Sequence, residues 1–268
     1  MSDQFPNRPT ALITGSGRHR VGNVIARFLA ERGYRIALHY HSSKDEAMET
    51  RETLRMQGVD CEAFPADVSD DADVQSMVDA VHERFGTIDV LATTASIWRP
   101  IPLDEITADD LNANFRINTL GTFFAARAAG AVMVKQPEGG AIVTFGDWAI
   151  ERPYLHHAAY LISKGTIPTL TRALALELGH RNPKVRVNCI HPGPVMFPPD
   201  ASDEERQQLI DSTVVKNGDC PEMVAHAVEF LIDNKFITGA CIPIDGGRHM
   251  FAPSDVERAS SSRLRHDR

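Results

Sequence analysis

Residues 10–22 read TALITGSGRHRVG, and this stretch decides the fold. Its first five residues, Thr10–Thr14, form a short, largely apolar run that predicts a buried strand. Glycines follow at Gly15, Gly17 and Gly22, and the apolar residues of 21–29 recur at helical spacing. Such a turn can hold a pyrophosphate, because backbone N–H groups and the positive end of the helix dipole converge there. We therefore predict a dinucleotide site at this turn; a tight turn with no ligand is the alternative.

The rest of the chain repeats this alternation of strand and helix. Short apolar runs predict six more strands, at residues 34–39, 61–64, 88–92, 141–145, 185–190 and 240–244. Segments of helical period separate them, at residues 43–56, 69–85, 107–115, 119–135, 158–178 and 221–232. Pro168 is expected to kink the segment at 158–178.

Near-continuous apolar strands separated by helices indicate a parallel sheet that is covered on both faces. We therefore expect an α/β fold, with a single doubly wound Rossmann-type domain at residues 10–252 and a sheet of about seven strands. The polar segments on either side, residues 1–9 and 253–268, are expected to be a flexible N-terminus and a flexible C-terminal tail.

Composition and charge argue against several functional classes. The chain has 268 residues, with 28 Lys and Arg against 36 Asp and Glu, and a formal net charge of −8. A nucleic-acid or membrane-surface binder needs clustered positive charge, and no apolar run reaches the roughly 18 residues of a membrane helix. The four cysteines lie far apart and form no C-x-x-C pair: Cys61, Cys189, Cys220 and Cys241. We therefore expect reduced thiols, no metal site and a cytoplasmic protein that binds neither nucleic acid nor membrane.

The end of the second predicted strand indicates which dinucleotide binds. That strand runs into residues 39–44, HYHSSK, which contain no Asp or Glu. A carboxylate at this place bonds the ribose of NAD and would repel the 2′-phosphate of NADP. The groups that can donate to such a phosphate are Arg20, His41, Ser42, Ser43 and Lys44. The sequence therefore favours NADP(H) over NAD; a polar loop without this role is the alternative.

A candidate catalytic pair lies in residues 160–164, YLISK. The i,i+4 spacing of Tyr160 and Lys164 puts both side chains on one face of the predicted helix. An ammonium beside a phenol stabilises the phenolate, so we expect the pKa of Tyr160 to be lowered toward neutrality. Such a phenol can protonate a substrate as a hydride arrives. Alone the pair is a common coincidence on helices, but together with the glycine turn it is specific.

The glycine turn and the Tyr160/Lys164 pair, about 145 residues apart, resemble the short-chain dehydrogenase/reductase family over roughly residues 10–250. The resemblance implies a hydride-transferring enzyme that takes a small-molecule substrate and assembles as a homodimer or homotetramer. It implies that Asn118, which is similar to a helix Asn of the family, holds a water for proton relay. It also implies the cofactor contacts, which are Gly15, Arg20, Val21, Gly22, His41, Ser42, Ser43, Asp67, Val68, Ala95, Lys164, Pro192 and Gly193.

One departure from the family pattern narrows the expected substrate. The family usually has a Ser thirteen positions before its Tyr, where the hydroxyl binds a carbonyl oxygen, and this position is Asp147 here. A carboxylate suits a substrate with N–H donors better than a ketone; a turn former after a strand is the alternative. The pteridine reductases are a branch of the family with an Asp at this point, and Ser96 and Trp98 resemble the segment that holds their substrate ring. Trp98 as a loop aromatic that packs on a neighbouring helix is the alternative.

These features predict an NADPH-dependent reductase of a pteridine-like C=N bond, in which Tyr160, assisted by Asp147 and Lys164, supplies the proton. Two alternatives stay open: a reductase or dehydrogenase of a ketone or alcohol, such as a 3-oxoacyl thioester, and an NADP-binding sensor without turnover. Asn118, Tyr160 and Lys164 together argue against the sensor, because a pure binder does not need all three. Three nearby histidines are expected to be structural or subunit-contact residues: His156, His157 and His191.

Overall fold

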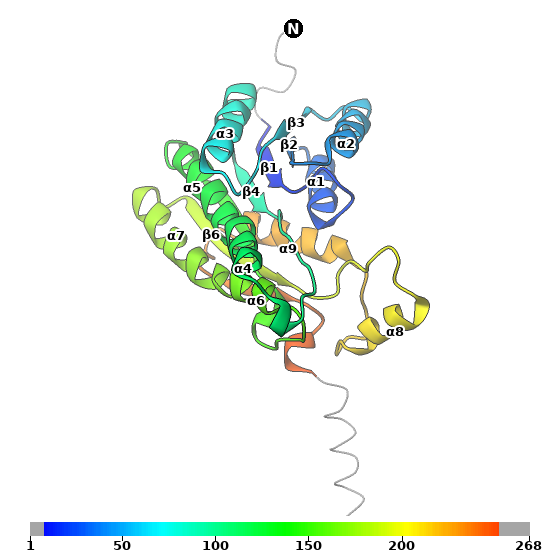
Figure 1. Cartoon of the computed structure of the whole chain (residues 1–268). Coiled ribbons are helices and arrows are strands. Elements are labelled where there is room, and N and C mark those ends of the chain that lie inside the picture. The colour runs from blue at the N-terminus through cyan, green and yellow to red at the C-terminus, as the bar shows by residue number, and fades with distance from the viewer. Residues whose placement is uncertain (1–7, 252–268) are drawn as a thin grey trace, which may run out of the picture.

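Seven parallel strands form one sheet, in the order β3-β2-β1-β4-β5-β6-β7 (Figure 1). The computed structural model describes residues 8–251. The strands are β1 (Thr10–Thr14), β2 (Arg35–Tyr40), β3 (Cys61–Pro65), β4 (Val90–Thr93), β5 (Gly140–Phe145), β6 (Val185–Pro192) and β7 (Cys241–Ile244). This arrangement confirms the predicted doubly wound α/β fold with a parallel sheet.

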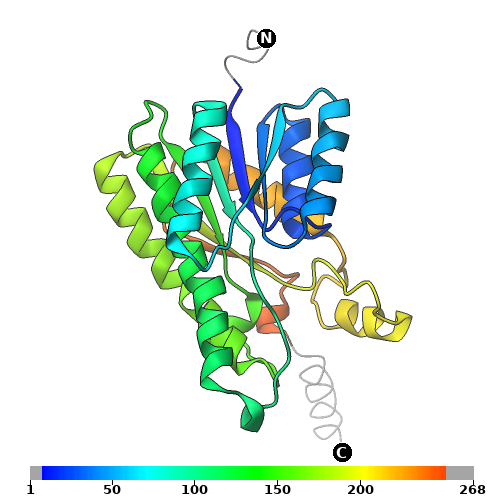
Figure 2. The same cartoon turned by 45° about the horizontal axis from the view of Figure 1, so that its top comes forward.

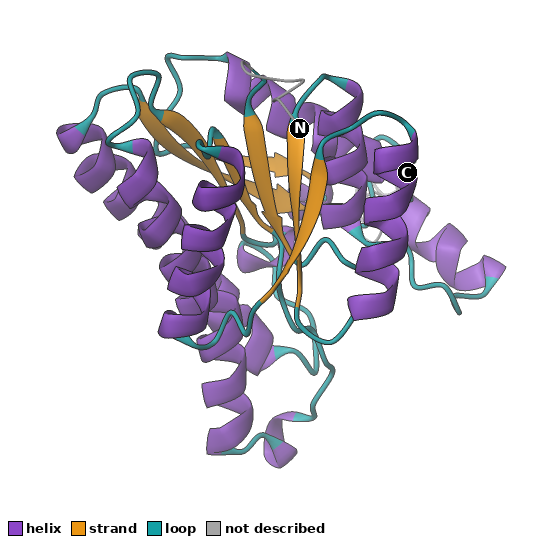
Figure 3. Ribbon diagram, turned by 90° about the horizontal axis from the view of Figure 1, so that it is seen from above, coloured by secondary structure: helices purple, strands orange, loops and turns teal. Residues whose placement is uncertain are grey.

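Helices cover both faces of the sheet, as Figure 2 and Figure 3 show from two further directions. The helices are α1 (Val21–Glu31), α2 (Lys44–Met56), α3 (Asp71–Phe85), α4 (Ala108–Asn114), α5 (Gly121–Met133), α6 (Ala158–Gly165), α7 (Ile167–Arg181), α8 (Asp203–Asp211) and α9 (Pro221–Asp233). Successive side chains of a strand point to opposite faces. Ala11 and Ile13 of β1 therefore join a core with α1, α2 and α9, whereas Leu12 joins a second core with α3, α5 and α7.

The helix predicted at residues 158–178 is two helices, and Pro168 explains the break. One residue, Thr166, separates α6 from α7, and Pro168 lies in the first turn of α7. Proline lacks an N–H group and disrupts a helix interior, but it fits a first turn, where amide groups have no intrahelical partner. The expected kink is therefore a helix boundary, and the candidate catalytic pair lies on the short helix α6.

Besides three short 3-10 turns, two further elements were not predicted: α8 and a π-helical turn, Phe115–Leu120, which joins α4 to α5. α8 begins with a capping box, because Ser202 and Glu205 each accept a hydrogen bond from the backbone N–H of the other. No residue of α8 is buried, so its sequence carries no apolar stripe that would reveal it. The signal that could have found α8 is the Ser-x-x-Glu pattern alone.

The predicted flexible ends fall largely outside the described residues. Residues 1–7 and 252–268 are not described, and the expectation for the tail at 253–268 lies among them. Residue Pro9 is held in place, because its carbonyl accepts a hydrogen bond from the N–H of Arg35 at the start of β2 (2.8 Å). Within residues 8–251, no helix is both long and apolar enough to cross a membrane.

The sheet changes direction of winding between β1 and β4, which are neighbours in the sheet but not in the chain. Ligands of such folds bind at the carboxyl ends of the strands near this point. Gly15 follows β1 there with a φ of +69°, a conformation that L side chains rarely adopt. A Cβ atom on Gly15 would lie 2.8 Å from the Cα and 2.9 Å from the nitrogen of Ala95, which follows β4. The glycine therefore lets the two strand ends come together.

His39 of β2 stabilises the same glycine turn through hydrogen bonds. Its Nδ1 accepts a hydrogen bond from the N–H of Gly15 (2.8 Å), and its Nε2 donates to the carbonyl of Ala66 (3.0 Å). The carbonyl of His39 accepts hydrogen bonds from the N–H groups of Ser16 and Gly17. Only the neutral ring can make both side-chain bonds, and burial lowers the pKa of His39 to about 4.

The variant Gly15→Ala should lose more stability than Gly58→Ala. Gly58 has a similar φ, +81°, but a Cβ atom there would meet nothing within 4 Å. Both variants bear the strain of a left-handed residue, about 1–2 kcal/mol, and only Gly15→Ala adds a collision with the backbone of Ala95. Urea unfolding of both variants measures the difference, and equal losses would show that the close approach to Ala95 does not constrain the turn.

Acidification should remove stability that neutral His39 provides. The unfolded side chain takes up a proton near pH 6.5, whereas the folded one does so only near pH 4. This contribution is therefore complete above about pH 6.5 and falls by up to about 3 kcal/mol as the pH drops from 6.5 to 4. Urea unfolding at several pH values should show a shallower dependence for His39→Gln than for the wild type. A wild-type slope in His39→Gln would refute the assignment.

Candidate active site

Tyr160 and Asp147 form the centre of the candidate active site. Asp147 follows β5, and its Oδ1 accepts a hydrogen bond from the N–H of Ala149 (2.8 Å) at a short 3-10 turn. The hydroxyl of Tyr160, on α6, donates a hydrogen bond to Oδ2 of Asp147 (2.6 Å). The structure therefore brings together the two residues that the sequence predicted as proton donors.

The predicted lowering of the Tyr160 pKa is wrong for this arrangement. Burial, the charge of Asp147 and the hydrogen bond to Asp147 all raise the pKa of Tyr160. Lys164 lies 6.0 Å from the centre of the Tyr160 ring, and its Nζ donates to the carbonyl of Phe145 (2.9 Å). Burial lowers the pKa of Lys164 to about 8 and raises the pKa of Asp147. The sequence pattern gave the position of the ammonium correctly but could not show that a carboxyl group lies closer to the phenol.

Asn118 fastens the loop after β4 to α6. Its Oδ1 accepts hydrogen bonds from the N–H of Ile97 (2.8 Å) and from the hydroxyl of Ser96 (3.0 Å). Its Nδ2 donates to the carbonyl of Ile97 (3.1 Å) and to Oγ of Ser163 (2.9 Å). These bonds use the hydrogen-bonding capacity of a side-chain amide, so a water relay at Asn118 would have to use its backbone. The hydroxyl of Ser96, predicted to bind substrate, is likewise engaged by Asn118.

An aromatic cluster surrounds Tyr160, and Trp98 belongs to it. Trp98 stacks on His157, with ring centres 4.7 Å apart, and its Nε1 donates to the hydroxyl of Tyr154 (2.8 Å). The rings of Tyr154 and Trp148 are stacked at 5.9 Å, and the ring of His157 lies 6.5 Å from that of Tyr160. Trp98 is 52% exposed, so part of this side chain is accessible from solvent.

Sequence reasoning missed the roles of Tyr154 and His157. His157 lies in the loop before α6, as expected, and it is buried there beside Tyr160. It precedes α6 and lies three residues before Tyr160, and this i,i+3 spacing could have identified it as a neighbour. No local pattern marks Tyr154, because its partners Trp98 and Trp148 come from other parts of the chain.

The start of α1 fits a dinucleotide pyrophosphate. Arg20 is its N-cap and makes no side-chain capping bond, and the first-turn amides of Val21 and Gly22 have no intrahelical partner. A Cβ atom on Gly22 would collide with Oγ1 of Thr94 and lie 3.1 Å from the carbonyl oxygen of Gly15. Gly15 contributes space rather than a free amide, since its N–H is bound to His39.

The loop predicted to bind the 2′-phosphate lies against the glycine turn. A Cβ atom on Gly17 would be 2.6 Å from Oγ of Ser43 and 2.9 Å from Cβ of Tyr40, so the turn and the end of β2 are in contact. Ser43 is buried, and the other expected donors are exposed: Arg20, His41, Ser42 and Lys44. No carboxylate follows β2 before α2 begins. The described residues therefore present donors to an anion at this rim.

The remaining predicted cofactor residues follow the ends of β3 and β6. Asp67 accepts a hydrogen bond from the N–H of Ser69 (2.9 Å), and Val68 is buried against Gly121 of α5. Pro192 ends β6, and Gly193 donates its N–H to the carbonyl of Ile244 (2.9 Å). These residues share the carboxyl edge of the sheet with the glycine turn, and their contacts with a cofactor stay predictions.

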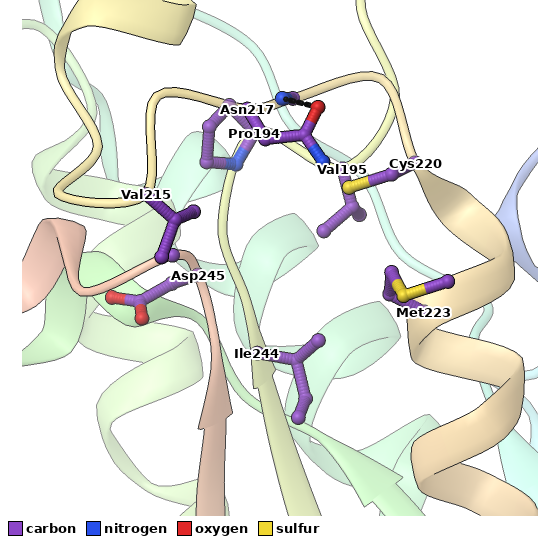
Figure 4. Close-up of a pocket in the computed structure, with 10 residues that line it drawn as sticks. Pro194, Val195, Val215, Asn217, Cys220, Met223, Ile244 and Asp245 are labelled. Carbon is purple, nitrogen blue, oxygen red and sulfur yellow. Dashed lines mark hydrogen bonds between the residues drawn. The ribbon is translucent and has the colours of Figure 1, made fainter.

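Two hollows lie near this edge. The larger, about 600 Å³, is bordered by Trp98, by residues of the segment 198–209 and by Arg248, whose guanidinium lies 4.3 Å from the ring of Trp148. The smaller, about 230 Å³, lies beyond Gly193, and its lining residues come from three loops, from β7 and from α9 (Figure 4). In Figure 4, Cys220 and Met223 face Val195 and Ile244 across it. Of these two hollows, only the larger includes a residue of the aromatic cluster around Tyr160.

Comparison with known proteins identifies relatives over nearly the whole chain. Residues 17–249 match the family model described as enoyl-(acyl carrier protein) reductase. Glucose 1-dehydrogenase 2 of Bacillus subtilis is 30% identical over 255 residues, which are 92% of this chain and 97% of the relative. A 3-oxoacyl-(acyl-carrier-protein) reductase of Staphylococcus aureus is 32% identical over 247 residues, which are 90% of this chain and 98% of the relative.

Solved structures give the same result. A blue fluorescent protein from a metagenomic library, in complex with NADPH, has a TM-score of 0.81 and 32% identity, and the match covers 91% of this chain and 99% of that one. An NAD⁺-bound xylitol dehydrogenase has a TM-score of 0.81 and 30% identity, with 91% and 100% covered. The fold, the Tyr160 and Lys164 pair and these matches show that the chain belongs to the short-chain dehydrogenase/reductase family of NAD(P)-dependent oxidoreductases.

Proposed function

We propose that this oxidoreductase uses NADPH to reduce a pteridine-like C=N bond, with Tyr160 and Asp147 together as the proton donor. The observation that carries the proposal is the 2.6 Å hydrogen bond between the Tyr160 hydroxyl and Asp147. A hydroxyl at position 147 could donate to a ketone oxygen at any pH, but a carboxyl can do so only when protonated. An acid here is suited to a heterocycle that offers N–H donors beside the reducible bond.

The pair can deliver a proton without leaving charge on the phenol. Burial raises the pKa of Asp147, which favours its protonated form. Protonated Asp147 can donate to the oxygen of Tyr160 while Tyr160 donates to a substrate nitrogen. The negative charge then rests on a carboxylate, a much weaker base than a phenolate. The Lys164 ammonium, whose charge acts on Asp147, stabilises that carboxylate, and the nicotinamide, when bound, supplies the hydride.

The preference for NADPH is supported by the chemistry of the rim beside the glycine turn. Arg20, His41 and Lys44 are exposed there, and no carboxylate follows β2 to repel a 2′-phosphate. The solved relatives do not decide between the cofactors, because one is an NADPH complex and another, equally similar in fold, is bound to NAD⁺. The proposal therefore rests on the residues of this chain.

A second candidate function is reduction of a ketone, such as a 3-oxoacyl thioester. It is favoured by the relatives, whose names are those of a glucose dehydrogenase and a 3-oxoacyl reductase. The two candidates differ in what Asp147 must do: protonated, it can donate to a ketone oxygen, and in either state it can accept from an N–H group. A sensor without turnover is not favoured, because a protein that only binds the cofactor does not need Asn118, Tyr160 and Lys164 together.

We further propose a cytoplasmic homodimer or homotetramer that takes a small-molecule substrate. α6 and α7 expose apolar side chains, with Ile162 60% and Leu176 73% accessible. Exposed apolar residues on adjacent helices are suited to a contact between copies of the chain. Light scattering of the purified protein tests the assembly.

NADPH should bind at least about tenfold more tightly than NADH, which corresponds to about 1.4 kcal/mol, because one charge-assisted phosphate contact has this strength. Arg20→Ala should weaken the binding of NADPH about tenfold and leave that of NADH nearly unchanged. Arg55→Ala removes an equal charge from α2 at an ion pair with Glu62 and should change neither affinity. Calorimetry with both cofactors measures these values. Equal wild-type affinities, or equal losses in Arg20→Ala, would contradict a 2′-phosphate site.

Asp147→Ser should separate the two candidate substrates. If the substrate is a pterin, turnover of dihydrobiopterin should fall at least about tenfold, since general-acid catalysis contributes more than this factor. Activity on simple activated ketones should hold or rise, because a serine hydroxyl donates at any pH. In the wild type, pterin reduction should decrease as the pH rises through the elevated pKa of Asp147, since the deprotonated acid cannot donate.

Tyr160→Phe is the reference variant, and it should lose about a hundredfold or more in turnover on either substrate while it binds the cofactor normally. NADPH absorbance follows every reaction. Unchanged pterin turnover in Asp147→Ser, or a wild type that reduces ketones but no pterin, would replace the first candidate with the second. Wild-type turnover in Tyr160→Phe would exclude both mechanisms.

A further inference from the structure

A cluster of two thiols and one imidazole lies between β6 and β7. Cys189 of β6 and Cys241 of β7 are paired in the register of the two strands. His191 lies two residues after Cys189, so both side chains project from the same face of β6. One ligand atom of each of the three residues lies within 4.8 Å of the others. The sheet therefore gathers three side chains that metal sites use.

The sequence could not reveal this cluster. Its residues form no C-x-x-C pair, and 52 positions separate Cys189 from Cys241. The expectation that the chain has no metal site, with a structural His191, rested on spacing alone. Only the parallel register of β6 and β7 brings the two cysteines opposite each other.

An independent observation concerns the histidine. His191 is 6% exposed, and its Nε2 is buried with no hydrogen-bond partner among residues 8–251. A buried polar atom without a partner costs about 1–3 kcal/mol. The ring interacts with the thiol of Cys241 and packs against the backbone of Gly146, where an added Cβ would be 2.8 Å from Nε2. His191 is therefore a buried imidazole with one ring nitrogen unpaired within the described residues.

We propose that Cys189, His191 and Cys241 form a binding site for a thiophilic divalent cation, with Zn²⁺ as the representative ion. Zn²⁺ binds two cysteines and a histidine at about 2.3 and 2.0–2.1 Å, which requires the ligand atoms to be about 3.5–3.8 Å apart. Side-chain movements of about 1 Å or less reach this geometry from the present cluster. Cys189 is fully buried and Cys241 is partly exposed, so the ion would enter on the Cys241 side.

Charge and proton balance are consistent with this site. Two thiolates neutralise a divalent ion, so the nearby positive charge of Arg172, which acts on Cys241, does not oppose it. Binding releases the thiol protons. The ion would tie β6 to β7 immediately before the turn at Pro192 and Gly193 and should raise the melting temperature of the protein.

Metal titration of the full chain tests the proposal directly. The protein is reduced, stripped with a chelator and titrated with Zn²⁺ by calorimetry and with Co²⁺ by absorbance. We expect one equivalent per chain and a thiolate-to-cobalt charge-transfer band, which reports sulfur ligation without any mutation. Cys241→Ser, at a partly exposed position, should weaken binding at least about a hundredfold, and circular dichroism checks that it folds. Cys220→Ser removes a thiol outside the cluster and should bind as the wild type does.

Three results of the metal titrations would overturn the proposal. They are the lack of a charge-transfer band, Zn²⁺ affinity that is equal in Cys241→Ser and wild type, and Zn²⁺ affinity that is lost in Cys220→Ser. Oxidation of the pair to a disulfide in air, with no metal uptake under reductant, would also overturn it, because the cluster would then be a redox pair. None of these measurements depends on turnover. The test of the metal site is therefore independent of which substrate the enzyme reduces.

Discussion

The hydrogen bond between Tyr160 and Asp147 is the central contact of the site, and the other contacts of the site hold these two residues in place. β5 delivers the acid and α6 delivers the phenol, and Lys164 fixes α6 to the end of β5 through the carbonyl of Phe145. Asn118, on the π-helical turn, binds both the loop after β4 and Ser163 of α6. The two proton-carrying groups are therefore held by four different elements, which fixes their separation before any ligand arrives.

Burial determines the charges in this part of the molecule. Desolvation opposes the charged form of a group, and here it acts on His39, Asp147, Tyr160 and Lys164 together. His39 stays neutral, and its ring stabilises the glycine turn by hydrogen bonds to Gly15 and Ala66. Asp147 and Tyr160 keep their protons more strongly than in water, which suits groups that must deliver a proton rather than hold a negative charge. The site thus combines hydrogen-bonded elements with two acids whose pKa values are raised by burial.

Local sequence patterns predicted the strands and most helices of the fold. Features that depend on contacts between distant elements could not be predicted from the sequence. Apolar periodicity and the glycine turn predicted the strands because these signals lie within a few residues of one another. The pKa of Tyr160 could not be predicted, because it depends on Asp147, which follows a different strand. The stacking of Trp98 on His157 and the Cys189 and Cys241 pair likewise arise from packing and register. The sequence predicts a kink at Pro168, but only the structure shows that this proline lies in the first turn of a separate helix, α7.

The central claim is that Asp147 is an acid with a raised pKa, and one measurement addresses it directly. Protein labelled with ¹³C at aspartate carboxyl carbons can be titrated by NMR, with Asp147→Asn to assign the signal. The account predicts that the Asp147 carboxyl titrates clearly above the range of ordinary aspartates, because burial outweighs its hydrogen bonds to Tyr160 and Ala149. A midpoint at or below the ordinary aspartate value would show that Asp147 is an ionised acceptor, and proton delivery through it would be excluded.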